Sequence, residues 1–117
     1  IVMRGRTHWL ARNGTNEYIA VIGLGRFGLS VAETLVGHGH EVIAIDSDPA
    51  LVQSLSSRLP HIVVADCSDR AAVDDLGLSQ VDHAVVAIGA DMEASVLTVM
   101  TLLEAGVVSA GETLVMM

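Results

Sequence analysis

The feature that most constrains this chain is a glycine-rich loop between an apolar run and an amphipathic run, in the stretch IAVIGLGRFGLSVAETL over residues 19–35. Gly23, Gly25 and Gly28 form the pattern G-x-G-x-x-G. Between a strand and a helix, the first glycine permits a tight turn, the second lets the backbone approach a diphosphate, and the third lets the helix pack against the strand. The helix that follows would point its unpaired N–H groups at the anion.

Strand-like and helix-like segments alternate four times along the chain. Apolar runs predict buried strands in EYIAVIG, EVIAID, HIVVAD and DHAVVAIG, and a segment with helical spacing follows each one. Such alternation predicts an α/β fold, namely a Rossmann-like doubly wound parallel sheet with helices on both faces. We expect the sheet to be truncated after the fourth strand, or after a fifth, edge strand over residues 113–117.

The helical segments carry apolar stripes that we expect to face the sheet. The first stripe holds Phe27, Val31 and Leu35, and the last holds Val96, Val99, Met100 and Leu103. Asp48 and Ser68 are expected to cap the second and third helices, because their side chains can accept a hydrogen bond from a first-turn N–H.

Length and composition indicate one domain with a modest core. The chain has 117 residues, is 51% hydrophobic, carries a formal net charge of −8 and contains no lysine. Because such a negatively charged surface repels the phosphate backbone, we do not expect a nucleic acid as partner. Residues 1–16 show no clear hydrophobic periodicity, and we interpret them as a leader or linker. Residues 17–117 are expected to form the nucleotide-binding domain.

Two charged residues sharpen the prediction for the glycine loop. Asp46 ends the second strand, where a carboxylate can accept hydrogen bonds from ribose hydroxyls and would repel a 2′-phosphate, which disfavours NADP. Arg26 lies inside the loop, where a cation opposes the helix dipole. It either pairs with a phosphate or is an ordinary solvated arginine.

The remaining reactive residue types give weaker signals. Asp66 ends the third strand, and it either faces a ligand or serves as a turn or helix cap. Cys67 is the only cysteine, so an intrachain disulfide is excluded, and a redox role is not expected. No metal site is expected, because the histidines lack ligand spacing, and no catalytic residues are predicted.

The stretches VIGLGRFGLSVAETLVGHGHEVIAIDSDP and VVADCSDRAAVDDLGLSQVDHAVVAIGADMEASVLTVMTLLEAGV resemble the N-terminal lobe of the RCK (regulator of potassium conductance) family, also called TrkA-N or KtrA-like. The resemblance covers about 90 residues, from Tyr18 to Val107. The G-L-G-R-F-G loop, the D-x-S-D stretch and the VAIGA stretch carry it. We do not expect the resemblance to extend to the family's C-terminal lobe, and SAGETLVMM is unlike the family's usual next strand.

The resemblance implies a cytosolic domain that binds ATP, ADP or NAD(H) and assembles into homo-oligomers, as dimers and octameric rings. It implies a membrane potassium channel or transporter subunit as partner, and a cytoplasmic location at the inner face of the membrane. The residues that it implies for nucleotide binding are Gly23, Leu24, Gly25, Arg26, Phe27, Gly28, Asp46, Ser47, Asp66, Cys67, Ile88 and Gly89. Among these, Arg26 would reach the terminal phosphate of ATP.

The sequence therefore predicts a binding module and not an enzyme: an adenine-nucleotide-sensing domain that gates potassium flux. The alternative is the NAD-binding half of a dehydrogenase, separated from its catalytic domain. A third reading is a regulatory domain fused to a cation antiporter or channel, with the arginine-rich leader as the link.

Overall fold

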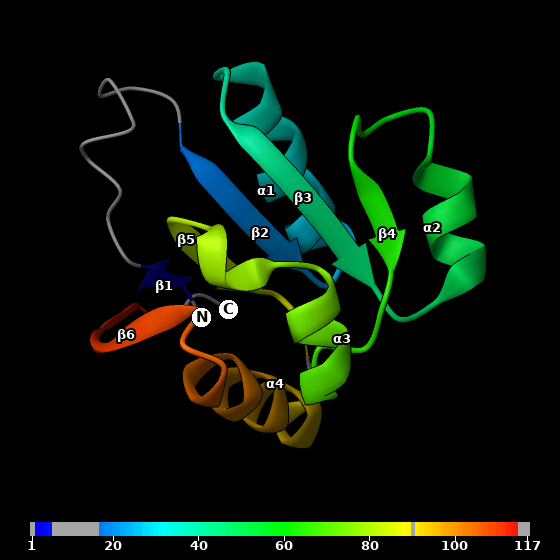
Figure 1. Ribbon diagram of the computed structural model, residues 1–117. Coiled ribbons are helices and arrows are strands. Elements are labelled where there is room, and N and C mark those ends of the chain that lie inside the picture. Colours follow the sequence, from blue (N-terminus) through cyan, green and yellow to red (C-terminus); the bar gives the residue numbers. More distant parts are fainter. Residues whose placement is uncertain (1, 6–16, 90, 115–117) are drawn as a thin grey trace.

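The computed structural model describes residues 2–5, 17–89 and 91–114, and gives side-chain surroundings for residues 17–89 and 91–107. Strands and helices alternate as the sequence predicts (Figure 1). The elements of the alternating part are β2 (Tyr18–Ile22), α1 (Arg26–Gly37), β3 (Glu41–Asp46), α2 (Pro49–Leu55), β4 (Ile62–Val64), α3 (Arg70–Asp75), the 3₁₀ turn η1 (Leu78–Gln80), β5 (His83–Val86) and α4 (Met92–Glu104). Two further strands are β1 (Val2–Gly5) and β6 (Val108–Leu114).

The described strands form one sheet in the order β4-β3-β2-β5-β1-β6. The first four are parallel, with β2 in register between β3 and β5, which confirms the Rossmann-like α/β fold. Because crossovers through helices place every carboxyl end of these strands at one edge, ligand-binding residues are expected to gather there.

The N-terminal residues differ from the prediction of a leader. Val2–Gly5 form β1, which pairs antiparallel with β5 and with β6. An unpaired β5 edge would expose a row of backbone N–H and C=O groups, and β1 satisfies them. Residues 6–16 lie outside the described residues. The expected edge strand over 113–117 begins earlier, at Val108, and residues 115–117 also lie outside the described part.

Helices cover both faces of the sheet. Alternate residues of β2 divide between two cores: Ile19 and Val21 pack with α1 and α2, and Ala20 and Ile22 pack with α3 and α4. This alternation is the period of two that an extended strand imposes on its side chains. Among the described residues, no helix is both long and apolar enough to cross a membrane.

The predicted inward stripe of α4 is confirmed in part. Val99 and Leu103 pack against the core, whereas Val96 and Met100 are exposed. The fully buried residues are Thr98, Thr101 and Leu102, so the buried face is rotated from the predicted stripe. Thr101 can be buried because its hydroxyl proton is shared between two carbonyl oxygens, those of Leu97 at 2.9 Å and Ser68 at 3.1 Å. In α1, Phe27 is likewise exposed, and Gly28 and Ala32 are the buried residues.

The helix starts differ in how they are capped. Asp48, Asp69 and Asp91 each accept a backbone N–H in the first turn of α2, α3 and α4. The expected cap at Ser68 is therefore wrong by one residue, because Ser68 bonds to Asp66 instead. The start of α1 at Gly25 has no side-chain cap.

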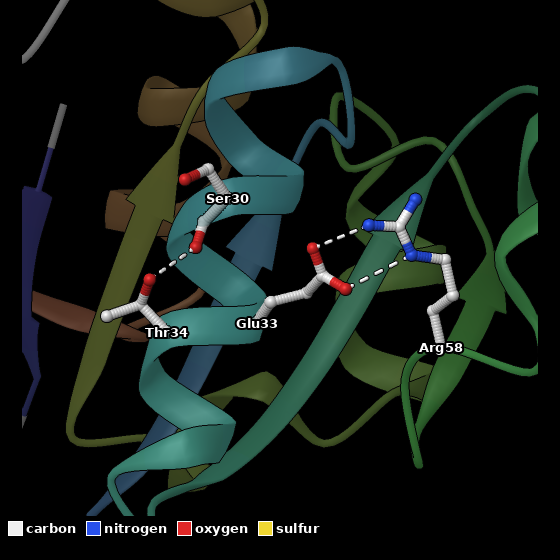
Figure 2. Close-up of polar contacts among 4 residues, drawn as sticks. All are labelled: Ser30, Glu33, Thr34 and Arg58. Atoms are coloured by element: carbon white, nitrogen blue, oxygen red, sulfur yellow. Dashed lines mark hydrogen bonds and ion pairs between the residues drawn. The ribbon is translucent and has the colours of Figure 1, made fainter.

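One ion pair joins α1 to the segment after α2, on the face that both helices cover. Figure 2 shows Glu33 accepting two hydrogen bonds from Arg58, from Nε at 3.1 Å and from Nη2 at 2.8 Å. One turn along α1, the Thr34 hydroxyl donates to the Ser30 carbonyl at 2.8 Å. The bidentate pair links α1 to the segment after α2, and both of its side chains remain partly exposed.

Candidate functional site

A cleft of about 400 Å³ opens at the carboxyl ends of the parallel strands. Every residue that the sequence analysis names for nucleotide binding, except Gly28, lines it: Gly23, Leu24, Gly25, Arg26, Phe27, Asp46, Ser47, Asp66, Cys67, Ile88 and Gly89. They come from four separate segments, each at or just beyond the carboxyl end of a parallel strand. The fold therefore gathers them at the position where ligands bind in sheets of this kind.

The three loop glycines differ in their surroundings. Gly23 has a positive φ of 97°, and a Cβ atom there would overlap the Ala87 carbonyl group. A Cβ atom on Gly28 would overlap the Gly23 carbonyl oxygen, so Gly28 lies behind the loop and not in the cleft. A Cβ atom on Gly25 would have no atom within 4 Å. Gly23 and Gly28 are thus needed for backbone packing, and Gly25 leaves open space at the cleft.

The N-terminal turn of α1 faces this open space. The first helical hydrogen bond runs from the Leu29 N–H to the Gly25 carbonyl at 2.9 Å. The N–H groups of residues 26–28 precede it, and no side chain of the described residues caps them. Unpaired N–H groups and the positive end of the helix dipole together attract an anion.

Arg26 adds a positive charge at the same point. The other arginines whose side chains the structure describes are paired: Arg58 with Glu33, and Arg70 with Asp74. Arg26 is exposed, lines the cleft and has no carboxylate partner within this part of the chain. A cation at a helix start raises the free energy of the helix unless an anion is bound beside it.

Asp46 lies at the end of β3, directly beside the glycine loop. Its Oδ2 accepts the Leu24 N–H at 2.8 Å, and its Oδ1 accepts the Asp48 N–H at 2.9 Å. Each carboxylate oxygen has two lone pairs, so each can accept one more hydrogen bond from the cleft. That is the capacity needed to bind a vicinal diol.

Asp66 and Cys67 form another wall of the cleft. Asp66 accepts hydrogen bonds from the Ser68 hydroxyl at 2.6 Å and the Ser68 N–H at 3.0 Å, and these bonds lower the pKa of its carboxyl. Cys67 is buried, and burial, together with the neighbouring Asp66 charge, raises the pKa of its thiol to about 11. The thiol therefore stays protonated at neutral pH and contributes an apolar surface.

The structure adds cleft residues that the sequence analysis missed: Ile22, Ala65, Ser68, Ala87, Asp91, Ala94 and Thr98. Ala65 and Ala87 directly follow β4 and β5, so the strand-end rule could have found them. Ala94 and Thr98 belong to α4, and they line the cleft because of the way this helix is rotated about its axis. Among the described residues, no three histidine, cysteine or acidic side chains converge as a metal site would require.

Comparison with known proteins agrees with this geometry. The family model for the TrkA-N domain matches residues 19–110. The chain is 44% identical over 88 residues to Ktr system potassium uptake protein C of Bacillus subtilis, a match that covers 75% of this chain and 40% of that protein. Over 89 residues it is 40% identical to Ktr system potassium uptake protein A of Bacillus subtilis, covering 76% of this chain and 40% of the relative.

A third relative, Ktr system potassium uptake protein A of Vibrio alginolyticus, is 39% identical over 94 residues, covering 80% of this chain and 43% of the relative. The chain thus spans less than half the length of these relatives. The matched region contains the glycine loop, Asp46 and the other cleft segments. The chain belongs to the TrkA-N family.

Proposed function

We propose that this chain is a regulatory domain that senses an adenine nucleotide and controls potassium flux through a membrane channel or transporter. One observation carries the proposal: the uncapped start of α1 and the Asp46 carboxylate face the same cleft. The first suits a phosphate chain, and the second suits a ribose. A nucleotide joins these two chemical groups in one molecule.

The potassium role follows from the relatives. All three are named as potassium uptake proteins of a Ktr system, and the family model that matches the chain spans the cleft residues. We therefore propose a membrane potassium transporter component as partner, and a cytoplasmic location beside it. The domain would bind its ligand without converting it.

The ligand in this proposal is ATP, ADP or NAD(H), and the affinity of the cleft for each of them would depend on its contact with Arg26. A guanidinium beside the α1 start would favour the ligand with the greatest phosphate charge. Two ligands that compete for one cleft can shift the protein between shapes only if they contact it differently. The terminal phosphate of ATP, held by Arg26 and absent from ADP, would supply that difference.

Homo-oligomer formation is part of the proposal, and α4 offers a surface for it. Met92, Val96, Leu97 and Met100 are exposed on this helix, with Met92 71% and Met100 51% accessible. Clustered exposed apolar side chains on one helix are typical of a protein interface. A second copy of the chain would bury them and carry a change in the cleft to a neighbouring subunit.

Thermal unfolding in the presence of nucleotides tests the proposal. A ligand that binds only the folded state raises the apparent stability, by about 2.7 kcal/mol at a concentration 100-fold above Kd. We expect ATP, ADP or NADH to raise the melting temperature and NADPH to have less effect, because Asp46 would repel its 2′-phosphate. No shift with any of them would refute the proposal. A shift with NADH alone, together with hydride transfer by the full-length protein, would favour the dehydrogenase alternative.

A further inference from the structure

The Asp46 carboxylate joins two backbone segments, the glycine loop and the residues that lead from β3 into α2. Leu24, in the glycine loop, donates its N–H to Oδ2, and Asp48, the N-cap of α2, donates its N–H to Oδ1. Both oxygens are therefore fixed by the protein itself. The Asp46 side chain, which would bind a ribose, thus also links β3 to the glycine loop by a hydrogen bond.

The hydrogen bond from Leu24 to Asp46 fixes the part of the glycine loop that leads into α1. The Gly23 N–H donates to the Ile45 carbonyl at 2.8 Å, and the Leu24 side chain is buried, with 1% of its surface exposed. Leu24 is thus held by the core through its side chain and by β3 through its amide. The next residue, Gly25, begins α1 and leads to the unpaired N–H groups.

We propose that Asp46 is a positioning residue for the phosphate-binding loop, in addition to its contact with ribose. The inference rests on the proposed function, because it assigns the loop to phosphate. It differs from that function in one consequence: a ligand that has phosphates but no sugar should still depend on Asp46. One carboxylate could both hold the loop and bind the ribose. Each of its oxygens accepts one backbone N–H and keeps one lone pair for a ribose hydroxyl.

The two roles predict opposite changes in the affinity for such a ligand when the Asp46 carboxylate is removed. Inorganic triphosphate has no hydroxyls for Asp46 to bind. If Asp46 only bound ribose, removing its negative charge would leave triphosphate binding unchanged or strengthen it, because two like charges would no longer repel. If Asp46 positions the loop, its removal weakens triphosphate binding in spite of that electrostatic gain.

The test uses Asp46→Asn, which keeps the shape of the side chain. An amide has one oxygen acceptor and an NH₂ donor, so it cannot accept both the Leu24 and Asp48 N–H groups. Asp75→Asn is the matched control, because it removes the same charge from an exposed residue outside the cleft. Calorimetry with inorganic triphosphate and with ATP is combined with hydrogen exchange of the Leu24 amide in the free protein.

We expect Asp46→Asn to weaken triphosphate binding about tenfold, as for the loss of a hydrogen bond to a charged group. We also expect faster exchange of the Leu24 amide in that variant, and neither change in Asp75→Asn. Unchanged or tighter triphosphate binding by Asp46→Asn, or unchanged Leu24 exchange, would overturn the inference while leaving ATP binding by the unmodified chain intact.

A measurement on the unmodified chain covers the case in which Asp46→Asn does not fold. In the ligand-free chain, the Leu24 and Asp48 amides should both be protected from hydrogen exchange, because an Asp46 carboxylate oxygen accepts each N–H. A Leu24 amide that exchanges as fast as an amide of an unfolded chain overturns the inference. Failure of the unmodified chain to bind ATP would refute the proposed function instead, and the exchange rate of the Leu24 amide would still report on its hydrogen bond to Asp46.

Discussion

A Cβ atom at Gly28 would overlap the carbonyl oxygen of Gly23, so the start of α1 packs directly on the first turn of the glycine loop. Gly25, between them, has open space around its α-carbon. Substitution by alanine should therefore separate two roles that the glycine pattern combines. Gly28→Ala tests backbone packing, and Gly25→Ala tests access to the cleft.

Gly28→Ala should lower the free energy of unfolding by about 3 kcal/mol, the upper range for overpacking against a rigid backbone. Gly25→Ala should change it by less than about 0.5 kcal/mol, because residue 25 has a negative φ that alanine adopts. Its methyl group should nevertheless weaken ATP binding, since it enters the space in front of the α1 amides. Urea unfolding and calorimetry measure the two effects, and equal stability losses in both variants would contradict this assignment.

Arg26→Ala should weaken ATP binding about tenfold and ADP binding only about twofold, because a charge-assisted contact to the third phosphate is lost. The ligand-free variant should be more stable by about 0.3 kcal/mol, since a cation no longer opposes the α1 dipole. Arg70→Ala is the control of equal charge, and it lies outside the cleft. Equal losses for ATP and ADP would exclude the proposed role of Arg26.

The Glu33–Arg58 pair should stabilise the fold slightly and leave the cleft unaffected (Figure 2). A double-mutant cycle with Glu33→Gln and Arg58→Gln should give a coupling energy of about 0.5 kcal/mol in urea unfolding, because both side chains are partly solvated. The coupling should fall at high salt. A change in ATP affinity in either variant would show that this helix contact reaches the binding site.

Cys67 should react slowly with iodoacetamide. Its pKa of about 11 makes the thiolate rare at neutral pH, and the sulfur is buried, so the rate should be on the order of 100-fold below that of a free cysteine. A folded-state pKa above the ordinary 9.0 means that the unfolded chain loses this proton first as the pH rises. The thiol's stabilising contribution is thus complete below pH 9.0 and is lost as the pH rises to about 11. A rate that levels off near pH 9.0 would contradict the raised pKa.

Much of the fold could be predicted from local pattern. The apolar runs that form β2, β3, β4 and β5, and the helical segments between them, carry their own signals, and the glycine loop fixes the order of strand, turn and helix. Strand β1 could not be predicted in this way. Its pairing depends on the free edge of β5, which is distant in sequence, and residues 2–5 have no marked period.

The rotation of α4 was not predictable either, because the helix is apolar on nearly every side. A stripe through Val96 and Met100 satisfies the helical period as well as one through Thr98 and Leu102. The contact of the Thr101 hydroxyl with the Ser68 carbonyl favours the second stripe, and it joins residues that are distant in sequence. This rotation also brings Ala94 and Thr98 to the cleft. The cleft residues that directly follow strands were predictable, because topology alone places them at one edge.

Binding of a nucleotide in this cleft is tested by titrating the chain with ATP and following the backbone amides by NMR. We expect saturable shifts concentrated at the amides of residues 25–28, with smaller ones at Asp46 and Gly89. Saturable shifts confined to residues outside the cleft, or no saturable shift at millimolar ATP, would show that the cleft is not a nucleotide site.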